Sequence, residues 1–168
     1  LQQPLLERLR DDSLMTIVCG STWPTDEAEL LAPLAHARKG KPMRLIIAPH
    51  EPDSGHLRGL EQRLDSLGFR HTRLSDVEKN GGRPPDVVVV DRLGVLADLY
   101  AIATIAYVGG GFHGSGLHSV VEPAAVGVPV IFGPRHGNAR EADELAGKGG
   151  GFVASDGAAA ASLILDLG

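Results

Sequence analysis

The chain is short of several features, and each shortage excludes a class of protein. It has one cysteine in 168 residues, so no disulfide can form within it. Lys and Arg number 16 against 21 Asp and Glu, and this net charge of −5 argues against a nucleic-acid-binding surface. The sequence has no apolar run of membrane-spanning length and no visible signal peptide. Only 4% of residues are aromatic, but 43% are hydrophobic, as expected for one globular domain over residues 1–168.

What the chain does have is glycine and a regular alternation of apolar segments. Its 22 glycines and 11 prolines indicate many tight connections. Strands are predicted at 14–20, 43–48, 69–74, 86–90, 104–108, 129–132 and 151–153, and helices at 25–38, 54–67, 94–102, 116–126, 138–147 and 157–166. Uninterrupted apolar strands, such as the four valines at 87–90, are typical of a parallel sheet buried on both faces. The sequence therefore predicts an α/β domain with a doubly wound parallel sheet.

Three smaller features complete this outline. Cys19 lies inside a predicted strand, where we expect a buried structural thiol. Residues 5–9 are interpreted as the tail of a connecting segment. Because the chain starts without Met and stops in an apolar helical stretch, we expect it to be a piece of a longer protein.

Two predicted loops carry polar side chains at the carboxyl ends of strands, where open α/β sheets bind ligands. In the first, the hydroxyls of Ser21 and Thr22, with their adjacent N–H groups, are suited to phosphate or carboxylate oxygens. The alternative is that either residue caps the next helix. In the second, His50 follows Pro49 and could bind an anion or shuttle a proton, the alternative being a simple turn residue. The scattered histidines form no zinc ligand set, and we expect no metal.

Other polar residues at this edge have a structural interpretation that we prefer. Asp91 is expected to N-cap the helix predicted at 94–102. Asn138 is expected to N-cap the helix at 138–147, with Glu141 completing a capping box.

The glycine cluster at 109–116 follows a predicted strand and leads into the helix predicted at 116–126. Its spacing does not match a dinucleotide fingerprint, and it comes late in the chain, so binding of NAD is disfavoured. The arrangement fits a sugar-nucleotide pocket better: N–H groups at the start of that helix would meet a phosphate. Glu122, placed about two turns into the helix, would accept hydrogen bonds from ribose hydroxyls. The alternative for Glu122 is a solvated helix carboxylate.

These segments resemble a known family. The residues at 20–24, 47–51, 99–112 and 118–134 are similar to those of 3-deoxy-D-manno-octulosonic acid (Kdo) transferases, over about residues 13 to 150. The most specific parts are the Gly-Gly-Gly-Phe at 109–112 and the Glu-Pro-Ala-Ala run that begins at Glu122. Such enzymes transfer Kdo from CMP-Kdo to a lipid A precursor in lipopolysaccharide biosynthesis. They have two Rossmann-like domains facing each other, the GT-B arrangement, and this chain resembles the C-terminal, donor-binding domain.

The resemblance also implies roles for individual residues. Ser21, Thr22, Pro49 and His50 would lie in the donor cleft, and Glu122 would bind the ribose. The remaining implied donor-binding residues are Gly110, Gly111, Phe112, Gly116 and Ser119. The chain departs from many members in having His50 in place of Arg and Ser119 in place of Asn. A neutral His is a weaker anion ligand than a permanently charged Arg.

The resemblance implies an inverting glycosyl transfer without a cofactor or metal. The catalytic base, the lipid A acceptor site and the membrane anchor would belong to an N-terminal domain absent from this sequence, at the cytoplasmic face of the bacterial inner membrane. The chain alone would then be soluble, bind the donor weakly and transfer nothing. Two alternatives stay open: a donor domain of another GT-B glycosyltransferase or UDP-sugar epimerase, and a non-catalytic α/β binding module.

Overall fold

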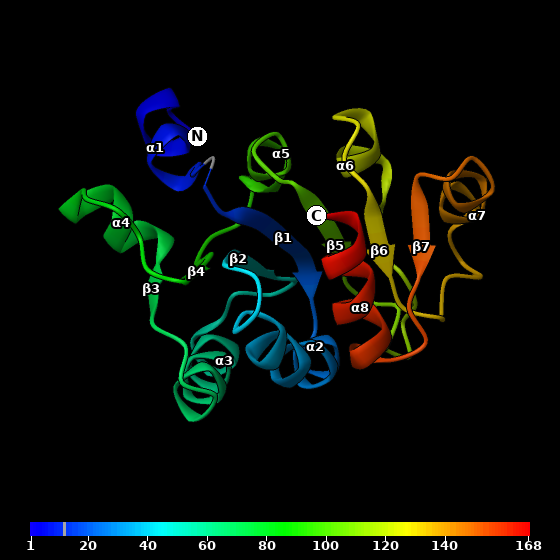
Figure 1. Ribbon diagram of the computed structural model, residues 1–168, viewed down its shortest axis with the longest axis horizontal. Coiled ribbons are helices and arrows are strands. Elements are labelled where there is room, and N and C mark those ends of the chain that lie inside the picture. Colours follow the sequence, from blue (N-terminus) through cyan, green and yellow to red (C-terminus); the bar gives the residue numbers. More distant parts are fainter. Residues whose placement is uncertain (12) are drawn as a thin grey trace.

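A single parallel sheet organises the residues described by the computed structural model, which are 1–11 and 13–168. Its seven strands lie in the order β3-β4-β2-β1-β5-β6-β7, and every neighbouring pair is parallel (Figure 1). The strands are β1 (Met15–Thr22), β2 (Met43–Pro49), β3 (His71–Arg73), β4 (Val87–Val89), β5 (Ile105–Val108), β6 (Val130–Phe132) and β7 (Gly151–Val153). The doubly wound sheet and all seven predicted strands are confirmed.

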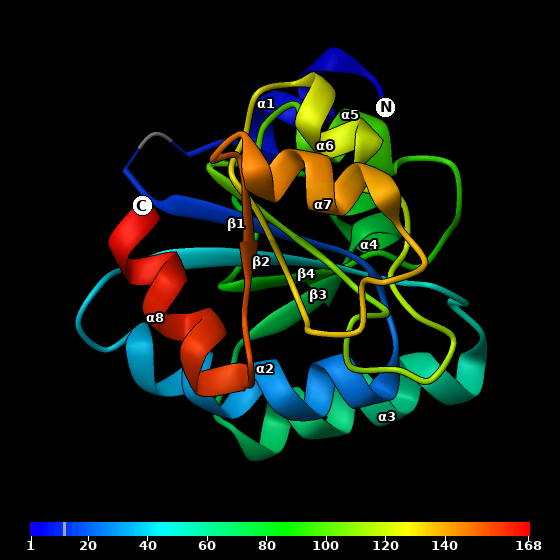
Figure 2. The same cartoon turned by 90° about the vertical axis from the view of Figure 1, so that its right-hand side faces the viewer.

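Helices cover both faces of the sheet (Figures 1 and 2). One face carries α2 (Pro24–Ala37), α3 (Ser54–Ser66) and α8 (Gly157–Leu167), and the other carries α1 (Gln3–Leu9), α4 (Leu74–Asn80), α5 (Leu96–Tyr100), α6 (Val121–Ala125) and α7 (Arg140–Gly147). Side chains alternate along each strand, so Ile17 and Cys19 enter the core under α2, α3 and α8, while Val18 enters the core on the opposite face. Cys19 is buried as expected, and burial raises the pKa of its thiol to about 12.

The sequence missed two short helices, α1 and α4. Each has seven residues, too few turns for helical periodicity to stand out from the pattern of a loop or strand. The segment at 5–9, interpreted as a connecting tail, instead packs Leu5 and Leu9 against the sheet. The buried Arg44 of β2 lies under this helix and donates to the carbonyl of Leu9 at 2.6 Å.

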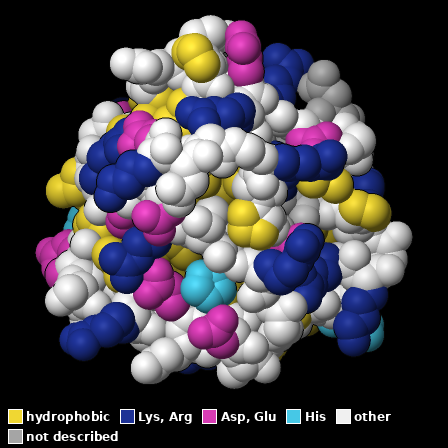
Figure 3. Space-filling model, turned by 90° about the vertical axis from the view of Figure 1, so that its left-hand side faces the viewer, with side chains coloured by type: hydrophobic (Ala, Val, Ile, Leu, Met, Phe, Trp, Pro, Cys, Tyr) yellow, Lys and Arg dark blue, Asp and Glu magenta, His cyan; other side chains and the backbone are white. Residues whose placement is uncertain are grey.

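The outer strand β3 hydrogen-bonds to β4, and ionic pairs surround this edge of the sheet. Arg73 on β3 forms a two-bond pair with Glu61 of α3, and Arg38 and Arg70 both contact Asp86 at 2.9 Å. Figure 3 shows basic and acidic side chains interspersed over this side of the molecule. Such charges discourage edge-to-edge pairing of sheets. Within the described residues, no helix combines the length and the apolarity needed to cross a membrane.

Candidate functional site

A cavity of about 500 Å³ opens at the carboxyl ends of β1, β2 and β4. It lies beside the point where the strand order reverses, since β1 sits between β2 and β5, and this is where doubly wound sheets bind ligands. The wall contains Ser21, Ala48, Pro49, His50, Val90, Arg92, Leu93, Gly94, Val95, Leu96, Ala97, Tyr100, His118, Ser119 and Glu122. The wall therefore combines an apolar side from β4 and α5 with polar groups from β1, β2 and the segment after β5.

Half of the donor-binding residues expected from the sequence meet in this cavity. Ser21, Pro49, His50, Ser119 and Glu122 line it, and Glu122 is exposed. Five others lie outside its lining: Thr22, Gly110, Gly111, Phe112 and Gly116. Phe112 instead lines a separate hollow on the side of α2. The structure thus brings together residues from three loops far apart in the sequence, but not the glycines themselves.

Ser21 and Thr22 point in different directions because β1 is irregular between them. The pairing of β1 with β2 shifts register between Gly20 and Thr22, and Ser21 has a φ of +51°, a conformation that non-glycine residues rarely adopt. Ser21 thereby reaches the cavity, whereas Thr22 turns inward and donates its hydroxyl to Glu27 at 2.8 Å. Neither residue caps α2, whose N-cap is Trp23, so the capping alternative for them is wrong.

Glu27 is itself part of a buried group under this loop. Its carboxylate accepts from Thr22 and contacts Nε2 of His56 at 2.9 Å, and the residue is 3% exposed. Burial raises the pKa of Glu27, which the nearby His56 partly opposes. Glu27 therefore holds the inner side of the loop and does not reach the cavity.

Four aromatic rings lie together beside the cavity. They are the indole of Trp23 and the imidazoles of His50, His113 and His118. The indole of Trp23 stacks on His113 with centroids 3.9 Å apart and planes 4° apart, and His50 lies 4.2 Å from His118. Nε1 of Trp23 donates to Nε2 of His118 at 3.0 Å. Burial, together with His50 and His113, lowers the pKa of His118, against an opposing effect of Asp26. Sequence reasoning found only His50, because the other members come from loops up to 95 residues apart.

Asp26 fixes the position of the loop that carries His113 and His118. It is fully buried, and its carboxylate accepts from the N–H of Trp23 at 2.8 Å, the hydroxyl of Tyr107 at 2.8 Å and the N–H of Gly110 at 3.0 Å. The sequence showed this residue only as an acid in the first turn of a helix. In the structure it joins α2, β5 and the glycine loop.

The glycine loop, residues 109–118, packs against the protein itself. A Cβ at Gly109 would lie 2.2 Å from the carbonyl oxygen of Ser21, and one at Gly111 would lie 2.5 Å from the backbone nitrogen of Gly133. A Cβ at Gly116 would lie 2.4 Å from Oδ1 of Asn138. Gly109 and Gly111 thus allow backbone segments to approach one another, and Gly116 makes room for the side chain of Asn138. The contact of this loop with CMP stays a prediction.

The helix expected at 116–126 begins only at Val121, which corrects the placement of Glu122 to the first turn. The N–H of Leu117 donates to Arg135 and to Asn138, and the N–H of His118 donates to Gly109, so neither amide is free to bind phosphate. The amides of residues 117 and 118, at the start of the expected helix, are therefore paired within the protein, and a phosphate site at the observed start of α6 stays a prediction.

The other capping predictions are also wrong. Asn138 binds the backbone of Leu117 through both its amide oxygen and its amide nitrogen, while the N-cap of α7 is Ala139. Without Asn138 as cap, Glu141 completes no capping box. Asp91 instead accepts at 3.2 Å from the N–H of Ser75, in the first turn of α4. The helix α5 begins only at Leu96, because Gly94 has a φ of +81°.

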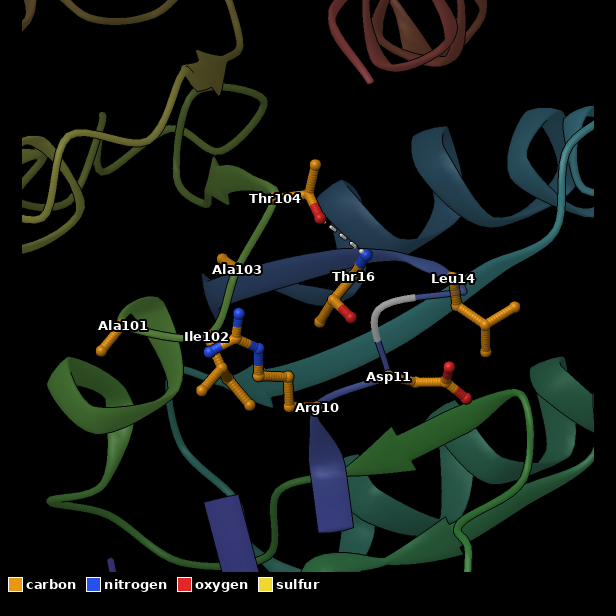
Figure 4. A pocket seen from close by; sticks show the side chains of 8 residues that line it. All are labelled: Arg10, Asp11, Leu14, Thr16, Ala101, Ile102, Ala103 and Thr104. Carbon is orange, nitrogen blue, oxygen red and sulfur yellow. Dashed lines mark hydrogen bonds between the residues drawn. The ribbon is translucent and has the colours of Figure 1, made fainter. Parts of the chain in front are cut away.

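A second hollow, of about 270 Å³, lies at the opposite edge of the sheet (Figure 4). Arg10, Asp11, Thr16 and Thr104 supply its polar groups, and the hydroxyl of Thr104 accepts from the N–H of Thr16 at 3.1 Å. Asp11 already binds Ser13 and Arg83. This hollow is at the amino ends of β1 and β5, away from the edge where such sheets bind ligands. Among the described residues, no three His, Cys, Asp or Glu side chains form a group able to hold a metal ion.

Comparison with known proteins gives this arrangement a context. No protein-family model matches the chain. It is 33% identical over 111 residues to the 3-deoxy-D-manno-octulosonic acid transferase of Aquifex aeolicus (strain VF5), which is 66% of this chain and 29% of that protein. It is 36% identical over 121 residues to the protein of the same name from Chlamydia muridarum, or 70% of this chain and 26% of that protein. The chain thus spans less than a third of the length of these curated relatives.

The fold has a solved counterpart. The crystal structure of the C-terminal CMP-Kdo binding domain of WaaA from Acinetobacter baumannii matches with a TM-score of 0.81, over 93% of this chain and 81% of that chain, at 22% identity. The chain therefore has the Rossmann-like α/β fold of a GT-B C-terminal domain. Together, the sequence matches and the fold identify it as a C-terminal domain of the 3-deoxy-D-manno-octulosonic acid transferase family.

Proposed function

We propose that this chain is the donor-binding domain of a Kdo transferase and that it binds CMP-Kdo in the cavity at the ends of β1, β2 and β4. The observation that carries the proposal is the meeting of Ser21, His50, His118 and Glu122 in one cavity at the switch point of the sheet. The relatives named for Kdo transfer and the fold of a CMP-Kdo binding domain support this choice of ligand.

The cavity offers complementary groups for a nucleotide sugar. The exposed carboxylate of Glu122 suits ribose hydroxyls, which are hydrogen-bond donors. The hydroxyl of Ser21 and the imidazoles of His50 and His118 suit the anionic oxygens. Arg92 also lines the cavity, but its guanidinium binds Glu78 in a two-bond pair. Hydroxyl and imidazole groups therefore supply most of the contacts to the phosphate.

The reaction in this proposal is an inverting glycosyl transfer. An acceptor hydroxyl on a lipid A precursor attacks the anomeric carbon of Kdo while CMP leaves from the opposite face. Hydrogen-bond donors fixed around the leaving phosphate stabilise its developing charge, so no metal is required. The base that takes the acceptor proton and the acceptor site belong to an N-terminal domain at the membrane, and the chain alone binds donor without transferring it.

A nucleotide titration tests the proposal. We expect CMP to shift the NMR signals of residues lining the cavity, and UMP or UDP to bind more weakly. Addition of EDTA should leave the affinity for CMP unchanged. Failure of CMP to bind, with binding of UDP instead, would favour a UDP-sugar enzyme, and failure of all three nucleotides would favour a non-catalytic module.

The Glu122→Ala variant tests the ribose contact. Loss of a hydrogen-bonding carboxylate should weaken CMP binding about tenfold or more. Because Glu122 is exposed, the free energy of unfolding should change by less than about 0.5 kcal/mol. Glu141→Ala, an exposed acid on α7 outside the cavity lining, is the matched control and should bind CMP normally. Equal affinity of the two variants would refute the ribose assignment.

A further inference from the structure

The hydrogen bond between Trp23 and His118 determines where the histidine carries its proton. An indole N–H can only donate, so Nε2 of His118 must accept, at 3.0 Å. A neutral imidazole that accepts at Nε2 carries its hydrogen on Nδ1. Protonation of His118 would place a second N–H opposite that of Trp23 and break the bond. The contact therefore favours one neutral tautomer of His118.

The surroundings of His118 act in the same direction. His50 from the end of β2 and His113 from the glycine loop lower its pKa, as burial does, while the carboxylate of Asp26 opposes them. Two further charged groups, Glu122 of α6 and Arg92 of the loop after β4, line the same cavity, and Arg92 is paired with Glu78. His118 is therefore expected to stay neutral near pH 7.

The edges of the imidazole ring show which atom is left for a ligand. Nε2 faces Trp23, and Cδ2 faces the glycine loop, 3.2 Å from the position that a Cβ on Gly110 would take. His118 nevertheless lines the cavity. The edge made of Nδ1 and Cε1 remains to contact a ligand, and Nδ1 carries the hydrogen.

We propose that Trp23 is a positioning residue, which holds His118 as its Nδ1–H tautomer so that His118 donates a hydrogen bond to an anionic oxygen of the bound ligand. The identity of that ligand, the phosphate of a cytidine nucleotide, rests on the proposed function. The tautomer is a property of the free protein. A neutral donor of this kind meets the anion without titrating near neutral pH, unlike an unconstrained histidine.

Two amide substitutions separate the two ring nitrogens. In His118→Asn the side-chain amide lies near the position of Nδ1 and can still donate to the ligand. In His118→Gln the amide reaches the position of Nε2, beside Trp23, and the donor at the Nδ1 position is lost. We expect the Asn variant to bind CMP within about threefold of the wild-type chain and the Gln variant to lose about tenfold or more. Thermal unfolding of both variants controls for folding.

Equal losses in the two variants, or a weaker Asn variant, would overturn the contact with the ligand. A merely structural role for the ring predicts that result, because the Gln variant keeps a partner for Trp23.

The role of Trp23 is tested by Trp23→Phe, which retains an aromatic ring against His113 but removes the indole N–H. In the wild-type chain, long-range ¹H–¹⁵N NMR should show the hydrogen of His118 on Nδ1. In the variant, the pKa of His118 should rise towards its ordinary value, and CMP affinity should depend on pH between about 5.5 and 7.5 more steeply than in the wild-type chain, where only the phosphate of CMP titrates.

The outcomes also separate this inference from the proposed function. A hydrogen on Nε2 in the wild-type chain, with normal CMP binding, would overturn the inference alone. Absence of CMP binding to the wild-type chain would overturn the proposed function and the ligand contact together.

Discussion

Two stretches near the candidate site are both marked by glycine, yet they are built in opposite ways. In the glycine loop at 109–118, the space beside Gly109, Gly111 and Gly116 is filled by other backbone or by Asn138. In the opposite wall, residues 92–97, nothing lies within 4 Å of the position of a Cβ on Gly94, and Leu93 is 71% exposed. Close packing therefore constrains the glycines of the first stretch, where Gly110 and Gly116 also have a positive φ, whereas Gly94 marks a left-handed turn in open space.

The contrast shows how a glycine cluster can mark a site by holding other groups in place. The glycine loop is bound to Asp26 at one end and Asn138 at the other, and His118 at its end lines the cavity. The loop thus holds polar groups in place, while the wall at 92–97 supplies the apolar and open side. Specificity is expected to depend on the side chains that the glycine loop carries.

The largest effect is expected for Gly111→Ala. Its Cβ would lie within 3 Å of three backbone atoms of Gly133, and neither backbone can move without displacing the end of a strand. We expect a loss of about 3 kcal/mol or more in the free energy of unfolding by urea. Gly114→Ala, in the same loop but with its nearest neighbour 3.9 Å away, should lose less than about 0.5 kcal/mol. A similar loss of unfolding free energy in the Gly111→Ala and Gly114→Ala variants would show that close backbone approach does not constrain this loop.

Asp26→Asn should be nearly as costly. The amide oxygen can still accept from the N–H groups of Trp23 and Gly110, but as a neutral acceptor, and the N–H₂ group replaces the oxygen that accepts from the Tyr107 hydroxyl. We expect a loss of about 2–3 kcal/mol in the free energy of unfolding. Asp166→Asn, an exposed acid on α8, is the control and should be neutral. A stable Asp26→Asn variant with unchanged histidine NMR signals would show that this carboxylate does not hold the loop.

A smaller effect is expected for Asn138→Ala. The variant loses two hydrogen bonds to the backbone of Leu117, at 3.0 and 2.9 Å, which should cost about 1 kcal/mol. Hydrogen exchange should become faster at the amides of 110–118 and stay unchanged at 92–97. Unchanged exchange in the glycine loop would mean that the packing of its glycines alone keeps it in place.

The smallest effect, and a gain, is expected for Ser21→Gly. Glycine relieves the cost of a positive φ, and after its larger chain entropy is subtracted, the net gain should be about 0.5 kcal/mol. The loss of the hydroxyl should at the same time weaken CMP binding. Ser21→Ala removes the same hydroxyl but keeps the strained conformation, so it should weaken CMP binding without the gain in stability, as measured by thermal unfolding.

The parts of the fold that the sequence predicted are those determined by local pattern. Strands with unbroken apolar runs, such as 45–48 and 87–90, are recognisable because both of their faces are buried. Short helices were missed or misplaced, because α1, α4, α5 and α6 depend on tertiary packing more than on their own propensity. Gly94, with its positive φ, delays the start of the helix predicted at 94–102, and the backbone pairing of Leu117 and His118 delays the start of the helix predicted at 116–126.

Residues of the candidate site were predicted only where the sequence of a single segment indicated their position. Ser21, His50 and Glu122 each follow a strand or a glycine cluster, and this placed them at the correct edge. Trp23 and His118 could not be paired from the sequence, because their contact joins loops 95 residues apart. The same holds for Asn138, whose capping interpretation used near neighbours while its actual partner is 21 residues away.

The buried cation beneath α1, Arg44, has a consequence for N-terminal truncation of this chain. Arg44 is 1% exposed, donates to the carbonyl that ends α1 and lies 3.8 Å from Asp11. A version that began at β1 would strip these two partners from the guanidinium, leave it the carbonyl of Pro84 at 3.3 Å, and uncover the apolar surface now shielded by Leu5 and Leu9. Residues 1–11, which precede the first strand, are therefore a structural part of the sheet's cover.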